Sequence, residues 1–112
     1  MDVSKDLVAA SATPLVLGIL AEGDSYGYAI IKRVTELSGG QLQWTDGMLY
    51  PVLHRLERHG FITSKWVSSE TGRQRKYYRI TKSGRAQLVE ERRRWQVVDD
   101  ALRNIWLKPR LA

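Results

Sequence analysis

Four stretches of the chain place apolar residues at helical spacing, and two shorter stretches have the composition of β-strands. The clearest helical stretch covers residues 45–58, and its apolar face consists of Leu49, Val52, Leu53 and Leu56. These residues follow the i, i+3, i+4, i+7 pattern of an amphipathic helix, which leaves the other faces polar. Thr45 is the expected N-cap and Gly60 the expected terminator. Pro51 predicts a slightly irregular helix, because proline removes one backbone hydrogen bond.

Two more helices are expected before this one. Residues 4–22 form a broad apolar stretch that Pro14 interrupts, so they predict either two short helices or one kinked helix. Residues 25–38 predict the next helix, which is followed by two glycines. Its expected buried stripe consists of Tyr26, Ile30, Val34 and Leu37. Tyr26 is therefore expected to be a core aromatic residue.

Two strand-like runs follow the helix at 45–58. Residues 61–67 and 75–81 are rich in β-branched and aromatic residues, and Gly72 lies in the polar segment between them. This pattern predicts a β-hairpin with a basic tip. Period-two alternation predicts an inner face formed by Ile62, Trp66, Tyr78 and Ile80.

A short link that contains glycine joins the helices at 25–38 and 45–58, which is the arrangement of a helix-turn-helix motif. A helical corner in any small domain has the same pattern. A hairpin directly after the motif forms a wing, so the predicted fold class is α+β, mainly α, a winged helix-turn-helix. In such a fold the second helix occupies the major groove of DNA and the wing lies along the backbone or in the minor groove. Alternatively, the hairpin only covers the core.

The last predicted helix, at about residues 82–107, has a heptad pattern. Leu88, Trp95 and Leu102 recur every seven positions, with Glu91, Val98 and Ile105 in the companion positions. A helix of about 25 residues is roughly 37 Å long at 1.5 Å per residue, which is too long for so small a domain to bury. We expect a homodimer with an interface of Leu88, Trp95, Val98, Leu102 and Ile105. The alternative is a helix that folds back on residues 4–22.

The charge of the chain is unevenly placed. The net charge is +6, yet residues 1–53 carry three Lys/Arg against six Asp/Glu, whereas residues 54–94 carry twelve against four. Such a basic segment is typical of a protein that binds phosphate backbones, because neutralised phosphates release counterions. A solubilising surface has the same composition. The pattern predicts a DNA-binding domain at residues 1–81 and a C-terminal dimerisation helix at residues 82–112, in one compact unit.

The composition argues against several classes of function. With no Cys and two His, the chain has neither a disulfide framework nor a usual zinc site, so no cofactor is expected. His54 and His59 do not share a helical face, and no nucleophile or glycine-rich phosphate loop is evident, so an enzyme is not expected. Residues 9–21 are too short and too polar a stretch to span a bilayer, which predicts a soluble cytoplasmic protein with no membrane partner.

Three sequence blocks, in this order, resemble the PadR family of transcriptional regulators. They are the step Tyr26-Gly27-Tyr28, the segment 47–57 with Gly60-Phe61-Ile62, and the segment 72–81. The single C-terminal helix is similar to the compact subfamily that includes the lactococcal multidrug-responsive repressor. Met48 stands where the family more often has Thr. The resemblance implies a winged helix-turn-helix homodimer that binds double-stranded operator DNA and typically represses transcription.

The resemblance also implies which residues face the DNA. The matching positions of the recognition helix are Thr45, Gly47 and Tyr50. The matching positions of the wing are Arg73, Arg75 and Lys76. From their chemistry, Tyr50 and the wing cations are expected to hold phosphates, while His54 or Arg55 contacts bases. Lys65 would extend the positive track.

An effector site is a further implication of the resemblance. In the compact relatives, a tryptophan of the last helix lines a pore at the dimer interface that accepts flat aromatic compounds, and Trp95 matches its place. Asp99 and Asp100 would favour a planar cationic ligand. Alternatively, Trp95 only packs in the heptad seam. The remaining tryptophans are expected to be packing residues: Trp44, Trp66 and Trp106.

A function of another class fits the same charge pattern. A winged-helix module can assemble with an acidic protein partner and have no specific DNA target. DNA binding and protein assembly differ in their response to salt and to sequence, because phosphate contacts weaken steeply as salt rises and base contacts select one site. The sequence alone leaves both hypotheses open.

Overall fold

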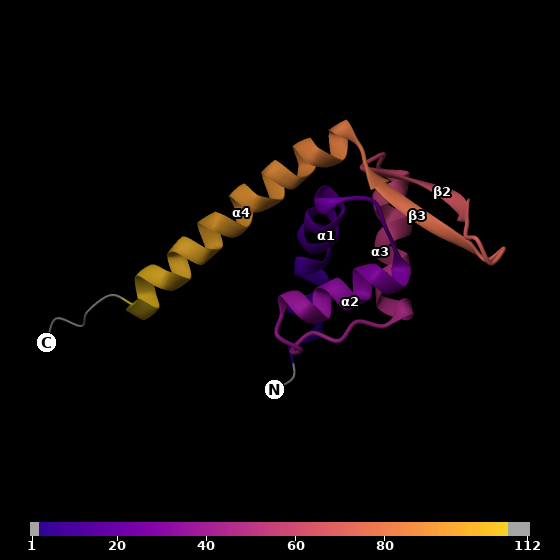
Figure 1. Cartoon of the computed structure of the whole chain (residues 1–112). Helices are drawn as coiled ribbons and strands as arrows, with labels where there is room; N and C mark the ends of the chain where they lie inside the picture. Colours follow the sequence, from indigo (N-terminus) through magenta and orange to yellow (C-terminus); the bar gives the residue numbers. More distant parts are fainter. Residues whose placement is uncertain (1–2, 108–112) are drawn as a thin grey trace, which may run out of the picture.

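A computed structural model describes residues 3–107 as four helices and one three-stranded antiparallel sheet (Figure 1). In the sheet, β3 lies between β1 and β2. The predicted fold class, a mainly helical winged helix-turn-helix, is confirmed. The elements are α1 (Lys5–Glu22), β1 (Ser25–Tyr26), α2 (Gly27–Leu37), α3 (Asp46–Arg58), β2 (Ile62–Ser68), β3 (Gln74–Ile80) and α4 (Lys82–Leu107).

One hydrophobic core lies between α1, α2, α3 and one face of the sheet. The apolar face predicted for α3 is buried as expected: Leu49, Val52, Leu53 and Leu56. The facing helices contribute Val16, Leu17, Leu20, Ile30 and Val34. The sheet contributes Ile62, Tyr78 and Ile80. These contacts hold α3 by one side only, so its opposite side is free to bind a partner.

Both internal prolines lie within continuous helices. α1 runs through Pro14 and α3 runs through Pro51, so the alternative of two short N-terminal helices is wrong. Each proline leaves one carbonyl four residues earlier, that of Ala10 or Gly47, without its helical donor. Both residues are exposed, and water can hydrogen-bond to these carbonyls. Solvation of the freed carbonyls explains why both helices continue.

The prediction for the start of the second helix was wrong. Ser25 and Tyr26 form the short strand β1, which pairs with Tyr78 and Tyr77 of β3, and α2 begins only at Gly27. Tyr26 is half-buried and packs edge-on against Tyr77, with ring centroids 5.3 Å apart, instead of entering the core. Pairing with a strand fifty residues away cannot be recognised from local periodicity. The last member of the predicted stripe, Leu37, is also exposed.

The predicted hairpin is formed by β2 and β3, with the pairing running from Ile62–Ile80 at the core to Ser68–Gln74 near the tip. Gly72 in the turn has a φ of 81°, a conformation that favours glycine. Trp66 has 64% of its surface exposed, so the prediction that it packs in the core was wrong. Trp106 was also predicted to be a packing residue, but it is exposed in this protomer. Trp44 is buried as expected.

Helix α4 begins at a tight junction with the end of α3. The Thr81 hydroxyl accepts a hydrogen bond from the Gly84 backbone N–H at 3.0 Å and donates one to the Gly60 carbonyl at 2.7 Å. A Cβ at Gly84 would overlap the Phe61 carbonyl, so only glycine fits there. The first part of α4, including Leu88, packs against the core, and the rest leaves the body (Figure 1). Residues 108–112, the end of the predicted C-terminal unit, lie outside the described residues.

Candidate nucleic-acid interface

The side of α3 opposite its buried face carries four exposed residues, Gly47, Pro51, His54 and Arg58. They lie on one side because successive residues of an α-helix are about 100° apart. In the N-terminal half of this side, Gly47 and Pro51 present no long side chain. In the C-terminal half, His54 and Arg58 present polar side chains. Thr45, the N-cap, is exposed beside it, although its side chain makes no capping hydrogen bond. Arg58 was outside the predicted DNA-binding set; extending the helical periodicity by one turn would have found it.

Arg55 occupies a different side of α3. Its guanidinium donates a hydrogen bond from Nη2 to the Thr13 hydroxyl of α1 at 3.0 Å, and the residue is half-buried. This contact turns Arg55 toward α1 and away from the line that contains His54. Of the two predicted base-contacting residues, His54 therefore has the more favourable position.

Tyr50 packs against the first turn of α2. A Cβ built on Gly27 would lie 2.5 Å from the Tyr50 hydroxyl oxygen, so there is no room for a side chain at residue 27. Tyr50 still has 38% of its surface exposed. The glycine of the Tyr26-Gly27-Tyr28 step is thus explained by the close approach of α3 to α2. Tyr28, the next residue, is exposed.

Tyr26 connects the wing to the contact between Tyr50 and Gly27. The Arg75 guanidinium carbon lies 4.4 Å from the ring centroid of Tyr26, which is a cation–π distance. Tyr26 immediately precedes Gly27, which Tyr50 contacts. A chain of neighbours therefore runs from Tyr50 of α3 through Gly27 and Tyr26 to Arg75 of β3. This chain of contacts connects α3 to the wing, although Arg75 itself lies on the face of the sheet opposite to the one that covers α3.

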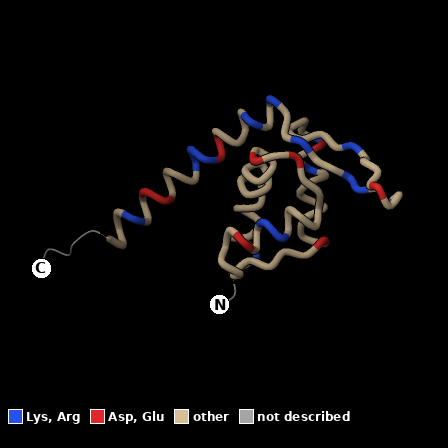
Figure 2. Tube along the Cα trace, viewed as in Figure 1, with Lys and Arg blue, Asp and Glu red and all other residues tan. Residues whose placement is uncertain are grey.

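The predicted wing cations do not all share one face. Residues that alternate along β3 point to opposite sides of the sheet, so Arg75 lies on one face and Lys76 on the other. The Lys76 ammonium is 5.7 Å from the ring centroid of Tyr78, on the face that covers α3. Lys65 pairs with Tyr77 and shares the face of Arg75, while Arg73 is exposed in the turn. Figure 2 shows the resulting distribution of cations along both strands.

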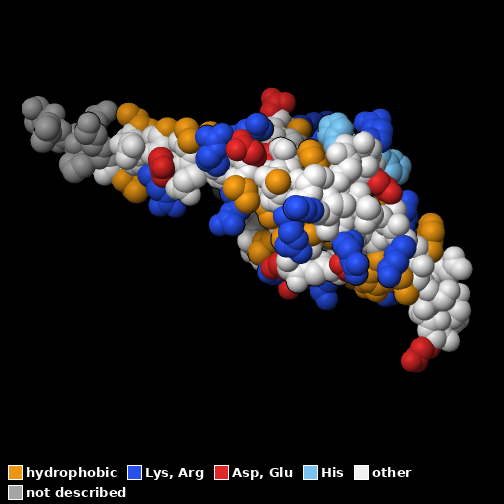
Figure 3. All heavy atoms as spheres, turned by 90° about the horizontal axis from the view of Figure 1, so that it is seen from above, with side chains coloured by type: hydrophobic (Ala, Val, Ile, Leu, Met, Phe, Trp, Pro, Cys, Tyr) orange, Lys and Arg blue, Asp and Glu red, His pale blue; other side chains and the backbone are white. Residues whose placement is uncertain are grey.

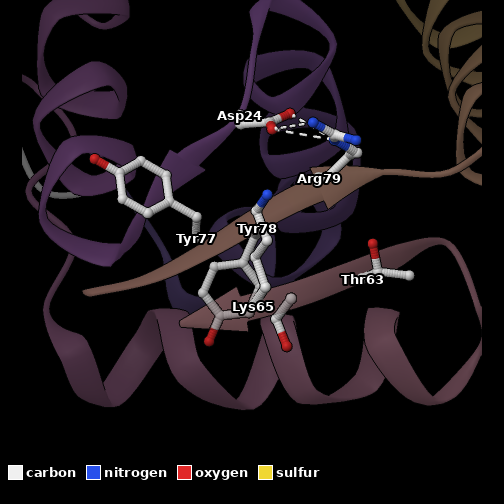
Figure 4. A pocket seen from close by; sticks show the side chains of 7 residues that line it. Asp24, Thr63, Lys65, Tyr77, Tyr78 and Arg79 are labelled. Atoms are coloured by element: carbon white, nitrogen blue, oxygen red, sulfur yellow. Dashed lines mark hydrogen bonds and ion pairs between the residues drawn. The ribbon is translucent and has the colours of Figure 1, made fainter. Parts of the chain in front are cut away.

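Asp24 and Arg79 form an ion pair on the outer face of the sheet. Arg79 Nη2 donates a hydrogen bond to Asp24 Oδ2 at 2.8 Å, at the edge of a hollow of about 130 Å³ (Figure 4). Hydrogen bonding from the guanidinium lowers the pKa of the Asp24 carboxyl and raises that of Arg79. The pair ties the end of α1 to β3, so Arg79 is occupied by a structural contact. The hollow is also lined by Thr63, Ser64, Lys65, Tyr77 and Tyr78.

The predicted dimer residues differ in their exposure. Leu88 packs against the core, Trp95 is half-buried, and the three residues that follow in the seam are exposed. Those three are Val98, Leu102 and Ile105. Figure 3 shows hydrophobic side chains exposed along α4, beyond the body of the molecule. The alternative that α4 folds back on α1 therefore holds only for its first half.

The two acidic residues of the predicted effector site have partners within α4. Asp99 forms an ion pair with Arg103 at 2.8 Å, and Asp100 accepts a hydrogen bond from the Gln96 amide at 2.8 Å. Both contacts are exposed helical pairs, which contribute little to stability and exchange readily. The carboxylates stay close to Trp95 in sequence.

Residues 3–107 contain neither a membrane-spanning helix nor a cluster of metal-binding side chains. No helix in this range is long and apolar enough to cross a bilayer. No group of three or more His, Asp or Glu side chains in the same range is placed to hold a metal ion.

Comparison with known proteins assigns the family. Residues 16–90 match the model of the transcriptional regulator PadR-like family. The chain belongs to the PadR family. A transcriptional regulator from Clostridium thermocellum has the same fold with a TM-score of 0.83, 31% identity, and coverage of 95% of this chain and 99% of that one. A PadR-like regulator from Bacillus cereus aligns with a TM-score of 0.80, 25% identity, and coverage of 95% and 100%.

The PadR match settles the class of function. The negative transcriptional regulator PadR of Bacillus subtilis is 29% identical over 80% of this chain, and the match spans 49% of that protein's length. This protein is therefore a transcriptional regulator of a DNA-binding family and not an enzyme. The roles of its individual residues stay predictions.

Proposed function

We propose that this PadR regulator binds operator DNA as a homodimer and represses transcription, with α3 in the major groove and the wing on the flanking backbone. The observation that carries the proposal is the connected set of contacts from Tyr50 through Gly27 and Tyr26 to Arg75. These contacts support a defined position of the wing relative to the recognition helix. A duplex can then contact both at once.

The proposed roles follow from chemistry and position. His54 contacts base edges, because it lies on the exposed side of α3 and has ring nitrogens that donate or accept. Thr45 and Gly47 allow the start of α3 to approach the backbone closely. The phosphate-holding residues are Tyr50, Lys65, Arg73, Arg75 and Lys76. Arg55 remains a secondary candidate, since it would first have to leave Thr13.

Dimerisation is proposed through α4. Its 26 residues carry an apolar seam, of which Leu102 and Ile105 have 38% and 73% of their surface exposed. Covering that seam with the same helix of a second copy removes apolar surface from water, which is the main driving force for association. Residues 1–81 then act as the DNA-binding domain and residues 82–112 as the dimerisation helix. Within the dimer, Trp95 with Asp99 and Asp100 is the proposed site for a planar aromatic effector that releases the DNA.

A competition titration tests this function. The protein is titrated against a duplex from its own upstream region and against a scrambled duplex, at several salt concentrations. We expect tight binding to the upstream duplex and an affinity for both duplexes that falls steeply with salt. Equal, weak binding to both duplexes would contradict sequence-specific repression and would favour assembly with an acidic protein partner.

A further inference from the structure

Trp66 is a large aromatic residue that the described residues, 3–107, leave mostly exposed. It has 64% of its surface exposed, although Ile62 and Tyr78, which lie on the same face of the sheet, have 1% each. The difference arises from position along β2, because Trp66 lies four residues beyond Ile62 toward the tip of the hairpin. Tryptophan is enriched at interfaces because its indole combines a large apolar surface with a polar N–H, so this exposed ring is suited to contact a binding partner.

The proposed dimer does not cover Trp66. The hairpin and the distal part of α4 extend from opposite ends of the body (Figure 1). Trp106, which is also exposed, lies at the dimer end of the molecule. Trp66 lies at the other end, with the recognition helix. Its partner is therefore something that approaches α3 and the wing together.

The neighbours of Trp66 show on which face of the sheet its side chain lies. Trp66 is directly opposite Lys76 in the hairpin, so both side chains lie on one face. Ser64, two residues before Trp66, donates a hydrogen bond to Glu57 of α3 at 2.7 Å. Because residues two apart share a face, Trp66 lies on the α3 side of the wing, beyond the part that α3 covers.

The charges around Trp66 favour an anionic partner. Lys76 lies opposite it on the same face and Arg73 is exposed in the turn, while Arg75 lies on the other face of the hairpin. Among the described side chains of the hairpin, 62–80, Glu70 at the tip is the one acidic residue against five Lys/Arg. An aromatic ring beside a cation is suited to a nucleic-acid strand, in which phosphates alternate with apolar sugar and base surfaces.

We propose that Trp66 contacts the deoxyribose and base edges of the minor groove that flanks the operator half-site, next to a phosphate held by Lys76. This inference rests on the proposed function and adds to it an apolar contact that none of the predicted cations supplies. Minor-groove proteins use apolar side chains in this way. The contact adds affinity without neutralising a phosphate, so it leaves the salt dependence of binding unchanged.

A matched set of variants tests the proposal. Trp66→Ala is compared with Trp66→Phe, with Lys76→Ala opposite it, and with Val67→Ala on the other face of the same strand. We expect Trp66→Ala to weaken operator binding about tenfold with the salt slope unchanged, and Trp66→Phe to retain most of the affinity. Lys76→Ala should lower the magnitude of the slope by about one, and Val67→Ala should bind normally. Thermal unfolding of each variant separates lost contacts from lost folding.

Two further measurements locate the contact. Trp44 is buried, and Trp95 and Trp106 lie in α4, so a DNA-induced change in tryptophan emission should disappear in Trp66→Phe. Trimming the flanks of the duplex should also remove the difference between Trp66→Ala and the unaltered protein. A folded Trp66→Ala variant that binds within twofold of the unaltered protein would overturn the proposal and leave operator binding intact. Failure of the unaltered protein to bind any duplex would overturn both proposals.

Discussion

The Arg75 guanidinium lies over the ring of Tyr26, 4.4 Å from its centroid, and thereby joins the wing to the start of α2. Tyr26 is held in turn by pairing with Tyr77 in the sheet and by edge-on packing against its ring. A cation–π contact at a partly exposed site contributes about 0.5–1 kcal/mol, so it orients Arg75 without fixing it. Arg75 is therefore held beside the start of α2 and still able to reach a phosphate.

The paired wing cations should determine the salt dependence of binding. Replacing Arg75 and Lys76 together by Ala removes two phosphate contacts on opposite faces of β3, so log affinity against log salt should become shallower by about two units. The loss should be similar for specific and scrambled duplexes, because phosphate contacts carry no sequence information. Arg92→Ala, an exposed cation of α4, is the matched control and should leave the slope unchanged. An unchanged slope in the double variant would remove the wing from the interface.

Gly27→Ala should destabilise the fold. The added Cβ meets the Tyr50 hydroxyl, and overpacking of this kind costs about 1–3 kcal/mol of unfolding free energy. Combining it with Tyr50→Ala should recover most of the loss, because the obstructing ring is gone. Gly18→Ala in α1 is the control: no atom lies within 4 Å of its Cβ, and alanine favours a helix by about 0.5–1 kcal/mol. Urea unfolding measures all four proteins; equal stability of Gly27→Ala and the unaltered protein would refute the contact.

His54 and Arg55 should differ in their effect on specificity. His54→Ala should relax the preference at one base position by about 1–3 kcal/mol, whereas Arg55→Ala should act mainly through the lost contact with Thr13. Thr13→Val removes the acceptor of that hydrogen bond and is the matched control for Arg55. Binding of each variant to a library of single-base changes in the operator measures the effect. The account of α3 would be wrong if Arg55→Ala alone relaxed a base preference.

The α4 seam should control dimerisation. Trp95→Asp places a charge in the seam and should shift the protein toward monomers, because a charge buried without a partner is costly. Val97→Asp, on the far side of the same helix and already 62% exposed, should remain dimeric. Sedimentation equilibrium distinguishes the two outcomes. If Trp95→Asp sediments as a dimer, another surface must form the interface.

Periodicity predicted α3 well because this helix buries a single apolar face. Leu49 and Leu56 are buried as predicted, and so is Tyr78 of the hairpin. The errors concern contacts between segments distant in sequence. Tyr26 pairs with β3, and Trp66 extends past the end of α3; neither fact is encoded in local spacing.

The candidate interface was predicted less completely than the fold. Sequence similarity supplied Tyr50 and Arg75, and the structure links them through Gly27 and Tyr26. It also adds Arg58, which shares the exposed side of α3 with His54. The orientation of Arg55 could not be predicted, because it depends on a hydroxyl 42 residues earlier in the chain.

The most direct test of the central claim is a hydroxyl-radical footprint of the protein on its own upstream DNA. A dimer that presents α3 and the wing on one side should protect two clusters of sugars, with centres about 34 Å apart or a multiple of that distance. Each cluster should extend into a flanking minor groove where the wing lies. A single unpaired cluster, or protection that does not depend on sequence, would contradict the account.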